Sequence, residues 1–163
     1  MENKYHIEID INEQCLRIFK GNKVVKEYPI STAKNGPGEQ IDSECTPRGA
    51  HIIAEKIGDG CSLNTVFVNR QPTGEIYTRE LREQNPGRDW ILTRILWLSG
   101  LEPGVNQGGE VDSHDRYIYI HGSPEDVAMG KPGSRGCIRM RNRDVIELFD
   151  RVPVNTRVLI RDN

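Results

Sequence analysis

Residues 121–140 have the sequence His-Gly-Ser-Pro-Glu-Asp-Val-Ala-Met-Gly-Lys-Pro-Gly-Ser-Arg-Gly-Cys-Ile-Arg-Met. The imidazole of His121 follows an apolar segment that predicts a strand, and the thiol of Cys137 comes 16 residues later. The segment between them is rich in glycine and proline, which predicts a loop. A thiol, a base and the exposed amides of a Gly-Cys step are the groups that covalent acyl transfer requires, because they supply nucleophile, proton acceptor and oxyanion donors.

Most of the remaining chain has the pattern of short strands. Ile7, Ile9 and Ile11 alternate with polar residues, which predicts one buried and one solvated face. The run 91–98 is apolar and partly β-branched, so it favours a strand over the alternative of a buried helix. The predicted strands cover residues 6–11, 16–19, 24–30, 50–54, 66–68, 76–77, 91–98, 116–121 and 157–160.

Helix and long loops fill the rest of the chain. Asn142 is predicted to cap a short helix whose apolar residues Val145, Leu148 and Phe149 follow helical spacing. We expect residues 33–48 to form an exposed loop and residues 104–114 to form a flap or rim loop. The fold class is therefore predicted to be mainly β, a sandwich or a barrel-like sheet with little helix.

Length and charge restrict the classes of function. The 163 residues suit one domain, and 36% hydrophobic with 28% charged residues is typical of a globular protein. The net charge of −2 gives no general attraction to nucleic acid or to an acidic membrane surface. No apolar run approaches the roughly 18 residues of a spanning helix. We therefore expect no nucleic-acid partner and no insertion into a membrane.

The cysteines and the first residues bear on the compartment. The chain has four cysteines, Cys15, Cys45, Cys61 and Cys137, which could form two disulfides. Because the chain has enough apolar residues to build a core without disulfides, free thiols are favoured. The first ten residues carry charges where a secretory signal would need an apolar run. The expectation is a cytoplasmic protein if Met1 is the native start, and a periplasmic one if an export signal was trimmed.

The motif around these residues resembles a known family. His121-Gly-Ser, the gap of 16 residues and Ser134-Arg-Gly-Cys-Ile-Arg-Met resemble the signature of L,D-transpeptidase (YkuD-type) catalytic domains. The resemblance includes the early strands, the Thr-Pro-Arg-Gly turn at 46–49 and the closing helix, and covers about residues 5–161. It implies a single catalytic domain over residues 1–163, with YkuD-like β-sheets, one or two short helices, no cofactor and no metal.

The resemblance also implies the roles of the reacting groups. Cys137 corresponds to the nucleophile that forms a thioester, and His121 to the base that takes the thiol proton or pairs with the thiolate. The carbonyl of Gly122 corresponds to the group that orients the imidazole. The backbone amides of Gly136, Cys137 and Arg135 correspond to the oxyanion hole.

Three further residues are predicted to bind substrate. Arg139 matches a basic position of the family, and its guanidinium suits a substrate carboxylate. Tyr119 shares a strand face with His121 by alternation, and Ser134 belongs to the motif, where its alternative role is to shape the turn. For Arg139 the alternative is a structural ion pair with one of the acids Glu125, Asp126 and Asp144.

One position departs from the family pattern. Arg135 stands where most relatives have histidine before the Gly-Cys step, which adds a fixed positive charge near Cys137 and is expected to favour the thiolate. A proton-shuttle role for this position is thereby in doubt. A metal site of His114, His121 and Cys137 has suitable ligand types, but its spacing matches no known zinc pattern.

The implied activity is acyl transfer on peptidoglycan stem peptides. An unexported chain is expected to act as an L,D-carboxypeptidase on recycled muropeptides, with water resolving the thioester. The alternatives are a periplasmic L,D-transpeptidase that forms cross-links or attaches protein, a sortase-like transpeptidase, and a non-catalytic wall-binding module. Papain-like peptidases are disfavoured because their cysteine precedes their histidine in the chain.

Overall fold

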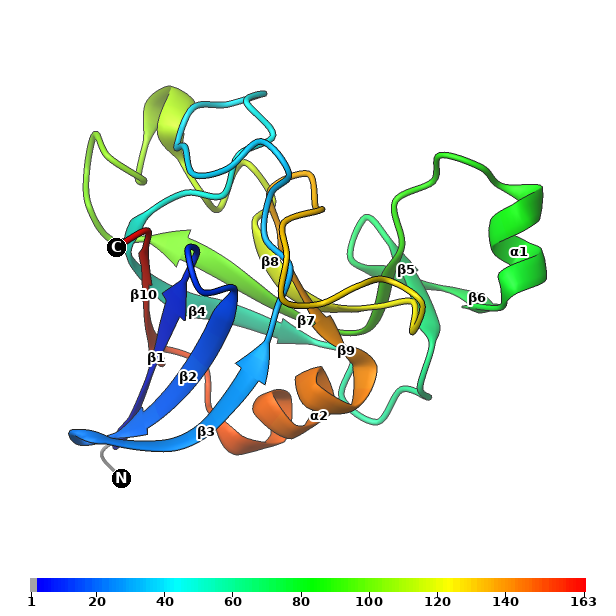
Figure 1. Cartoon of the computed structure of the whole chain (residues 1–163), viewed down its shortest axis with the longest axis horizontal. Helices are drawn as coiled ribbons and strands as arrows, with labels where there is room; N and C mark the ends of the chain where they lie inside the picture. The colour runs from blue at the N-terminus through cyan, green and yellow to red at the C-terminus, as the bar shows by residue number, and fades with distance from the viewer. Residues whose placement is uncertain (1–2) are drawn as a thin grey trace.

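The strands of the computed structural model, which describes residues 3–163, join in one strongly curled sheet (Figure 1). The main path runs β3-β2-β1-β10-β4-β7-β5-β6, and β8 branches from β7 to pair with β9. The strands are β1 (Tyr5–Asp10), β2 (Cys15–Lys20), β3 (Lys23–Pro29), β4 (Gly49–Ile57), β5 (Thr65–Val68), β6 (Gln71–Ile76), β7 (Ile91–Gly100), β8 (Tyr119–Ser123), β9 (Ile138–Arg141) and β10 (Arg157–Arg161). The helices are α1 (Arg79–Gln84) and α2 (Asn142–Arg151), with a 3-10 turn at Gly109–Val111.

The main core lies between the curled sheet and α2. Ile7 and Ile9 of β1 are completely buried, as their alternation predicts. From the other side, α2 packs on β7 and β8 through its buried residues Val145, Leu148 and Phe149. The segment β5-β6-α1 lies at the opposite end of the molecule from β3 (Figure 1).

The central strand β7 confirms the strand prediction for residues 91–98. It pairs with β4, β5 and β8 at its edges, and its consecutive residues 92–96 are all buried, so both of its faces are covered, which explains its nearly continuous apolar sequence. The register with β8 shifts between Leu92 and Ile95, and the bulged residue Thr93 has a φ of 75°. Such a conformation strains a β-branched residue and bends β7 where it faces the end of β8.

Two predictions of secondary structure were wrong. Residues 116–117 lie in a turn and residue 118 has no regular structure, so β8 begins only at Tyr119. Asn142 does not cap α2, because Arg141 occupies the N-cap position and the Asn142 side chain turns into the core. Helix α1, which has no fully buried residue, and the four-residue strand β9 were not predicted.

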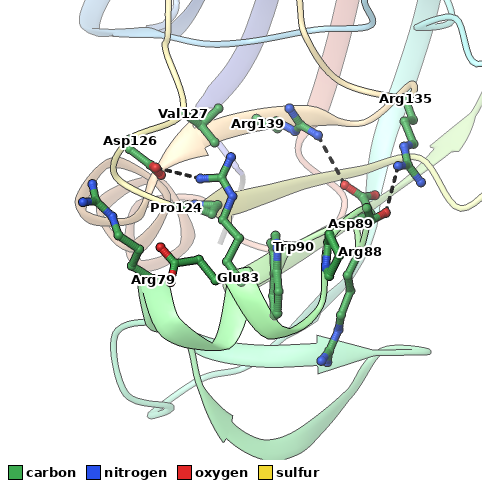
Figure 2. A pocket seen from close by; sticks show the side chains of 13 residues that line it. Arg79, Glu83, Arg88, Asp89, Trp90, Pro124, Asp126, Val127, Arg135 and Arg139 are labelled. Atoms are coloured by element: carbon green, nitrogen blue, oxygen red, sulfur yellow. Dashed lines mark hydrogen bonds and ion pairs between the residues drawn. The ribbon is translucent and has the colours of Figure 1, made fainter.

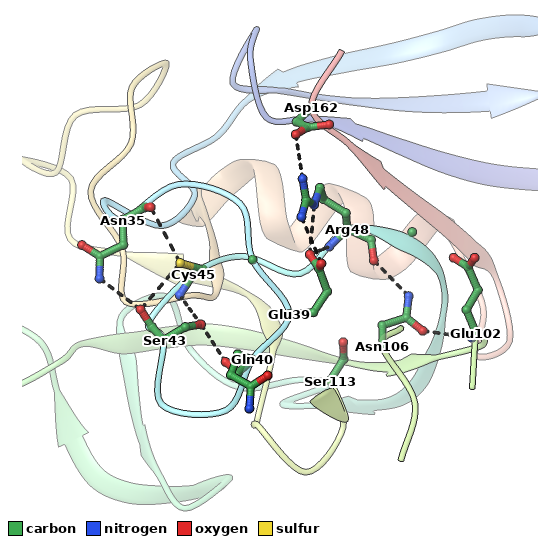
Figure 3. A network of polar contacts seen from close by, with 12 residues as sticks. Asn35, Glu39, Gln40, Ser43, Cys45, Arg48, Glu102, Asn106, Ser113 and Asp162 are labelled. Carbon is green, nitrogen blue, oxygen red and sulfur yellow. Dashed lines mark hydrogen bonds and ion pairs between the residues drawn. The ribbon is translucent and has the colours of Figure 1, made fainter. Parts of the chain in front are cut away.

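The loop of residues 33–48 is exposed but firmly held. Ala33 and Thr46 have no exposed surface. Arg48 bonds to Glu39 at 3.0 Å and to Asp162 at 3.1 Å, which connects the loop to the end of the chain (Figure 3). The loop is thus exposed over much of its length, as predicted, and is anchored through Ala33, Thr46 and Arg48.

The loop of residues 104–114 is fixed at its base. Asn106 is fully buried and donates to the carbonyl oxygens of Arg48 and Ala50 at 3.0 and 3.1 Å (Figure 3). Ser113 is also fully buried and contacts Nε2 of His51 at 2.8 Å. These contacts join it to β4 as a fixed rim of the sheet rather than a free flap. None of the helices in residues 3–163 has the length and apolarity needed to cross a bilayer.

Candidate active site

Parallel pairing of β8 and β9 brings the predicted site residues onto one face. The register places Arg139 beside His121. Tyr119 and Cys137 each precede one of these residues by two positions, so their side chains lie on the same face. Strand spacing and rise put the Cα atoms of Cys137 and His121 about 8 Å apart. All four side chains line one cavity of about 270 Å³, which Ser134 and Arg135 also border.

The imidazole of His121 is held by its own strand. Only 1% of the residue is exposed, and Nδ1 lies 2.6 Å from the carbonyl oxygen of Gly122. Because a carbonyl only accepts, Nδ1 carries the proton and the lone pair of Nε2 remains free. Burial lowers the pKa of His121, against the opposing charge of Asp89, so the ring is a neutral base at pH 7. This is the geometry that the predicted orienting role of Gly122 requires.

Gly122 is glycine because the core leaves no room for a side chain. A Cβ atom there would lie 2.3 Å from Oδ1 of Asn142 and 2.6 Å from the carbonyl oxygen of Leu92. Asn142 is itself fixed, since Oγ1 of Thr93 donates to its Oδ1 at 2.8 Å. The buried pair Thr93–Asn142 therefore supports the strand end that carries His121. Sequence reasoning missed this role because it assigned Asn142 to a helix cap.

The thiol of Cys137 has two backbone contacts. The Tyr119 amide donates to the sulfur at 3.3 Å, and the thiol donates to the carbonyl oxygen of Tyr117 at 3.3 Å. Burial raises the pKa of Cys137 to about 12, although the Tyr119 amide and the charges of Arg139 and Arg116 act in the opposite direction. The resting site thus pairs a neutral thiol with a neutral imidazole.

The side chain of Arg135 bonds to the protein backbone. It is exposed, and its guanidinium donates to the carbonyl oxygen of Gly87 at 3.1 Å. The cations that lower the pKa of Cys137 are Arg139 and Arg116. Arg135 borders the cavity of Cys137, but its guanidinium is held at Gly87, so the expectation that it favours a thiolate stays a prediction.

The turn before Cys137 is fixed by two hydroxyl groups. Gly136 has a φ of 133°, and a Cβ atom there would lie 3.2 Å from the carbonyl oxygen of Cys45. Thr46 Oγ1 donates to the Gly136 carbonyl at 2.9 Å. Ser134 Oγ accepts from the Gly136 amide at 3.2 Å and donates to the Cys137 carbonyl at 2.5 Å.

These contacts bear on the predicted oxyanion hole. The Gly136 amide is already bonded to Ser134, whereas the amides of Cys137 and Arg135 have no hydrogen bond within residues 3–163. The latter two are the donors that remain available to an oxyanion. Ser134 is 3% exposed, and its hydroxyl serves the loop backbone.

The partner of Arg139 is a residue that the sequence did not indicate. Its guanidinium bonds to Asp89 at 3.3 Å, not to Glu125, Asp126 or Asp144 as the structural alternative had it. Asp89 belongs to the loop before β7, 50 residues from Arg139 in sequence, and no periodic pattern in that loop indicates its role. It borders the same cavity as His121 and Cys137.

Aromatic and cationic side chains form another wall of the cavity. Arg70 donates to the hydroxyl of Tyr119 at 3.1 Å and lies 4.9 Å and 4.8 Å from the ring centres of Trp97 and Tyr117. His114 stacks on Trp97 with a centroid distance of 4.0 Å. In residues 3–163, no group of three or more His, Cys, Asp or Glu side chains has the arrangement of a metal site.

Comparison with known proteins agrees with this geometry. The YkuD family model, described as the L,D-transpeptidase catalytic domain, matches residues 4–160. The chain belongs to the YkuD family. Over 156 residues it is 33% identical to the putative L,D-transpeptidase YkuD of Bacillus licheniformis, covering 96% of this chain and 65% of the relative. Over 150 residues it is 47% identical to the putative L,D-transpeptidase YqjB of Bacillus subtilis, covering 91% and 66%.

Solved structures confirm the predicted mainly β fold of this YkuD-family chain. An L,D-transpeptidase from Mycobacterium smegmatis has a TM-score of 0.58 at 18% identity, covering 98% of this chain and 59% of that one. A Bdellovibrio bacteriovorus protein has a TM-score of 0.62 at 18% identity, covering 99% and 49%. The chain thus spans just under two-thirds of the curated relatives described above.

Proposed function

We propose that this YkuD-family domain is a cysteine acyltransferase that acts on the tetrapeptide stem of peptidoglycan. The observation that carries the proposal is the placement of Cys137, His121 and Arg139 on one face of β8 and β9, around one cavity. The Nδ1 contact of His121 leaves its Nε2 free to act as a base. In this scheme the sulfur attacks the carbonyl carbon of the third stem residue.

The first step follows from the neutral state of both groups. As the sulfur bonds to the carbonyl carbon, Nε2 of His121 takes the thiol proton, and the amides of Cys137 and Arg135 bind the oxyanion. Collapse of the tetrahedral intermediate breaks the bond to D-alanine, whose amine leaves with the proton from His121. The product is a thioester on Cys137. Arg139 positions a carboxylate of the donor.

A second cavity supports the second step. It has a volume of about 320 Å³ and reaches Cys137, and its border carries three carboxylates, Asp42, Glu44 and Asp115, against the two cations Arg116 and Arg135. Carboxylates at its rim attract a cationic acceptor amine toward the thioester. This observation favours L,D-transpeptidation. If water takes the place of the amine, the same thioester yields a tripeptide, which is L,D-carboxypeptidation, including on recycled muropeptides.

The test is incubation of the protein with a disaccharide tetrapeptide, followed by mass spectrometry of the products. A dimer that lacks one alanine supports transfer, and a disaccharide tripeptide with free D-alanine supports hydrolysis. The Cys137→Ala variant is the matched control and is expected to form neither. Absence of both products with the unmodified chain contradicts the proposed function.

A further inference from the structure

A larger cavity adjoins the site but has no part in the chemistry above. It has a volume of about 610 Å³ and lies between the α1 segment and the loop that follows β8 (Figure 2). Asp89, Arg135 and Arg139 border both this cavity and the one that contains Cys137. The two cavities are therefore adjacent.

Arginine side chains dominate the walls of this cavity, which we call the arginine cavity. Arg88 is turned away and bonds to Glu75 at 2.7 Å (Figure 2). The other four arginines come from α1 and from the segment around Cys137 and β9. They are Arg79, Arg82, Arg135 and Arg139.

Three acidic residues line the arginine cavity, Glu83, Asp89 and Asp126, so they do not fully neutralise the other four arginines. Asp126 bonds to Arg82 at 2.7 Å, and Asp89 bonds to Arg139 at 3.3 Å (Figure 2). Arg79 forms no ion pair within residues 3–163. The side chains of Arg82 and Asp126 are 43% and 46% exposed, and such an exposed pair is weak enough for a ligand carboxylate to replace Asp126. The guanidinium fork suits a carboxylate in particular.

Distance along the strand indicates which part of a donor peptide reaches this cavity. Arg139 lies two residues beyond Cys137, roughly 7 Å along the strand, and Arg79 and Arg82 belong to a different element farther out. The leaving D-alanine is a single residue and is too short to extend past Arg139. The part of the donor that precedes the scissile bond is long enough.

We propose that the arginine cavity binds a free carboxylate of the donor peptide on the amino-terminal side of the scissile bond. This inference rests on the proposed function, because it assumes that a stem peptide occupies Cys137. In a stem peptide the second residue, a D-glutamate joined through its γ-carboxyl group, presents a free α-carboxylate there. Arg135, which departs from the family histidine, then belongs to donor binding.

The test compares two tetrapeptides that differ only at this carboxylate, D-glutamate in one and its α-amide in the other. Binding is measured with the full chain carrying Cys137→Ala, so that no turnover occurs. The acidic peptide is expected to bind about tenfold more tightly, and Arg79→Gln with Arg82→Gln is expected to remove this preference. Arg157→Gln, an exposed arginine on β10 that borders no described cavity, is expected to retain it. Equal affinities for the two peptides, or a preference that survives the double substitution, overturn the inference.

Acylation of the unmodified chain separates this inference from the proposed function. If both peptides form the thioester with equal apparent affinity, the carboxylate site is wrong and the acyltransferase proposal stands. If the acidic peptide binds through Arg79 and Arg82 but no thioester forms, the acyltransferase proposal is wrong and the carboxylate site stands. Unchanged melting temperatures establish that the arginine variants are folded, and Arg79→Gln alone gives a second, milder variant.

Discussion

The backbone amide of Tyr119 donates a hydrogen bond to the sulfur of Cys137 over 3.3 Å, and the thiol returns a bond to the Tyr117 carbonyl. The first contact favours the thiolate and the second favours the thiol. Burial decides between them, because it raises the pKa of Cys137 to about 12. In the proposed acylation we therefore expect the thiol to lose its proton during the attack and not before it.

This pairing predicts the pH dependence of acylation. Burial lowers the pKa of His121 below its ordinary value of about 6.5, so the imidazole is neutral at pH 7 and becomes protonated only in acid. We expect the acylation rate constant to be flat from about pH 7 to 9 and to fall in acid below about pH 6.5. Rapid-quench measurement of acylation across this range checks it. A rate that rises tenfold per pH unit above pH 7 would instead indicate attack by a preformed thiolate.

A methyl group at Gly122 is expected to disturb the base. Gly122→Ala places a Cβ atom 2.3 Å from Oδ1 of Asn142, which forces the strand end that orients His121 to move. We expect a loss of about 1–3 kcal/mol in the free energy of unfolding, together with slower acylation. Urea unfolding and acylation kinetics measure the two effects. Gly130→Ala is the control for stability: no atom lies within 4 Å of its added methyl group, but its φ of 86° disfavours a side chain, so it is expected to lose stability while its acylation rate stays normal.

The hydroxyl of Thr46 is expected to matter for both stability and rate. It accepts from the Ala33 amide and donates to the Gly136 carbonyl, both at 2.9 Å, in a fully buried position. Thr46→Val leaves both backbone groups unpaired, so we expect a loss of about 2 kcal/mol and slower acylation at the loosened turn.

The control for Thr46 is Thr156→Val, which removes a buried hydroxyl with a similar pair of contacts, to Asn3 and Pro153. Thr156 borders neither cavity at Cys137. We expect a comparable loss of stability with an unchanged acylation rate. Equal slowing in the two variants would show that the rate follows overall stability and not the turn at Gly136.

The acidic rim of the second cavity is expected to set the choice between amine and water. Asp42→Asn with Glu44→Gln removes two exposed carboxylates near the thioester, so the ratio of dimer to tripeptide is expected to fall several-fold at low salt. Product analysis at two ionic strengths measures this ratio, and the difference between the proteins is expected to shrink at high salt. Asp59→Asn, an exposed acid that borders neither cavity, is the control. An unchanged ratio of dimer to tripeptide would contradict the proposal that these carboxylates attract the acceptor amine.

Local sequence patterns carried most of the strand predictions. The run 91–98 was assigned correctly because β-branched and apolar residues, interrupted only at Arg94, suit a strand covered on both faces. Strand β9 was not predicted because its four residues form a strand only by pairing with β8, and α1 was not predicted because it presents no apolar face.

The residues of the candidate site likewise fall into those that local sequence indicates and those that only the tertiary fold brings together. Cys137 and His121 were selected by a motif, and the structure brings them to one cavity. Asp89, the partner of Arg139, lies in a distant loop, and only the tertiary fold places it there. Asn142 is a residue type that commonly caps helices, but its side chain instead accepts a hydrogen bond from Thr93 in the core.

The most direct test of the account is the intact mass of the protein during incubation with a stem tetrapeptide. The account predicts a transient mass increase equal to the tripeptide acyl group, located on Cys137 by peptide mapping and absent from Cys137→Ala. A covalent adduct on another residue, or undiminished turnover by Cys137→Ala, would contradict it.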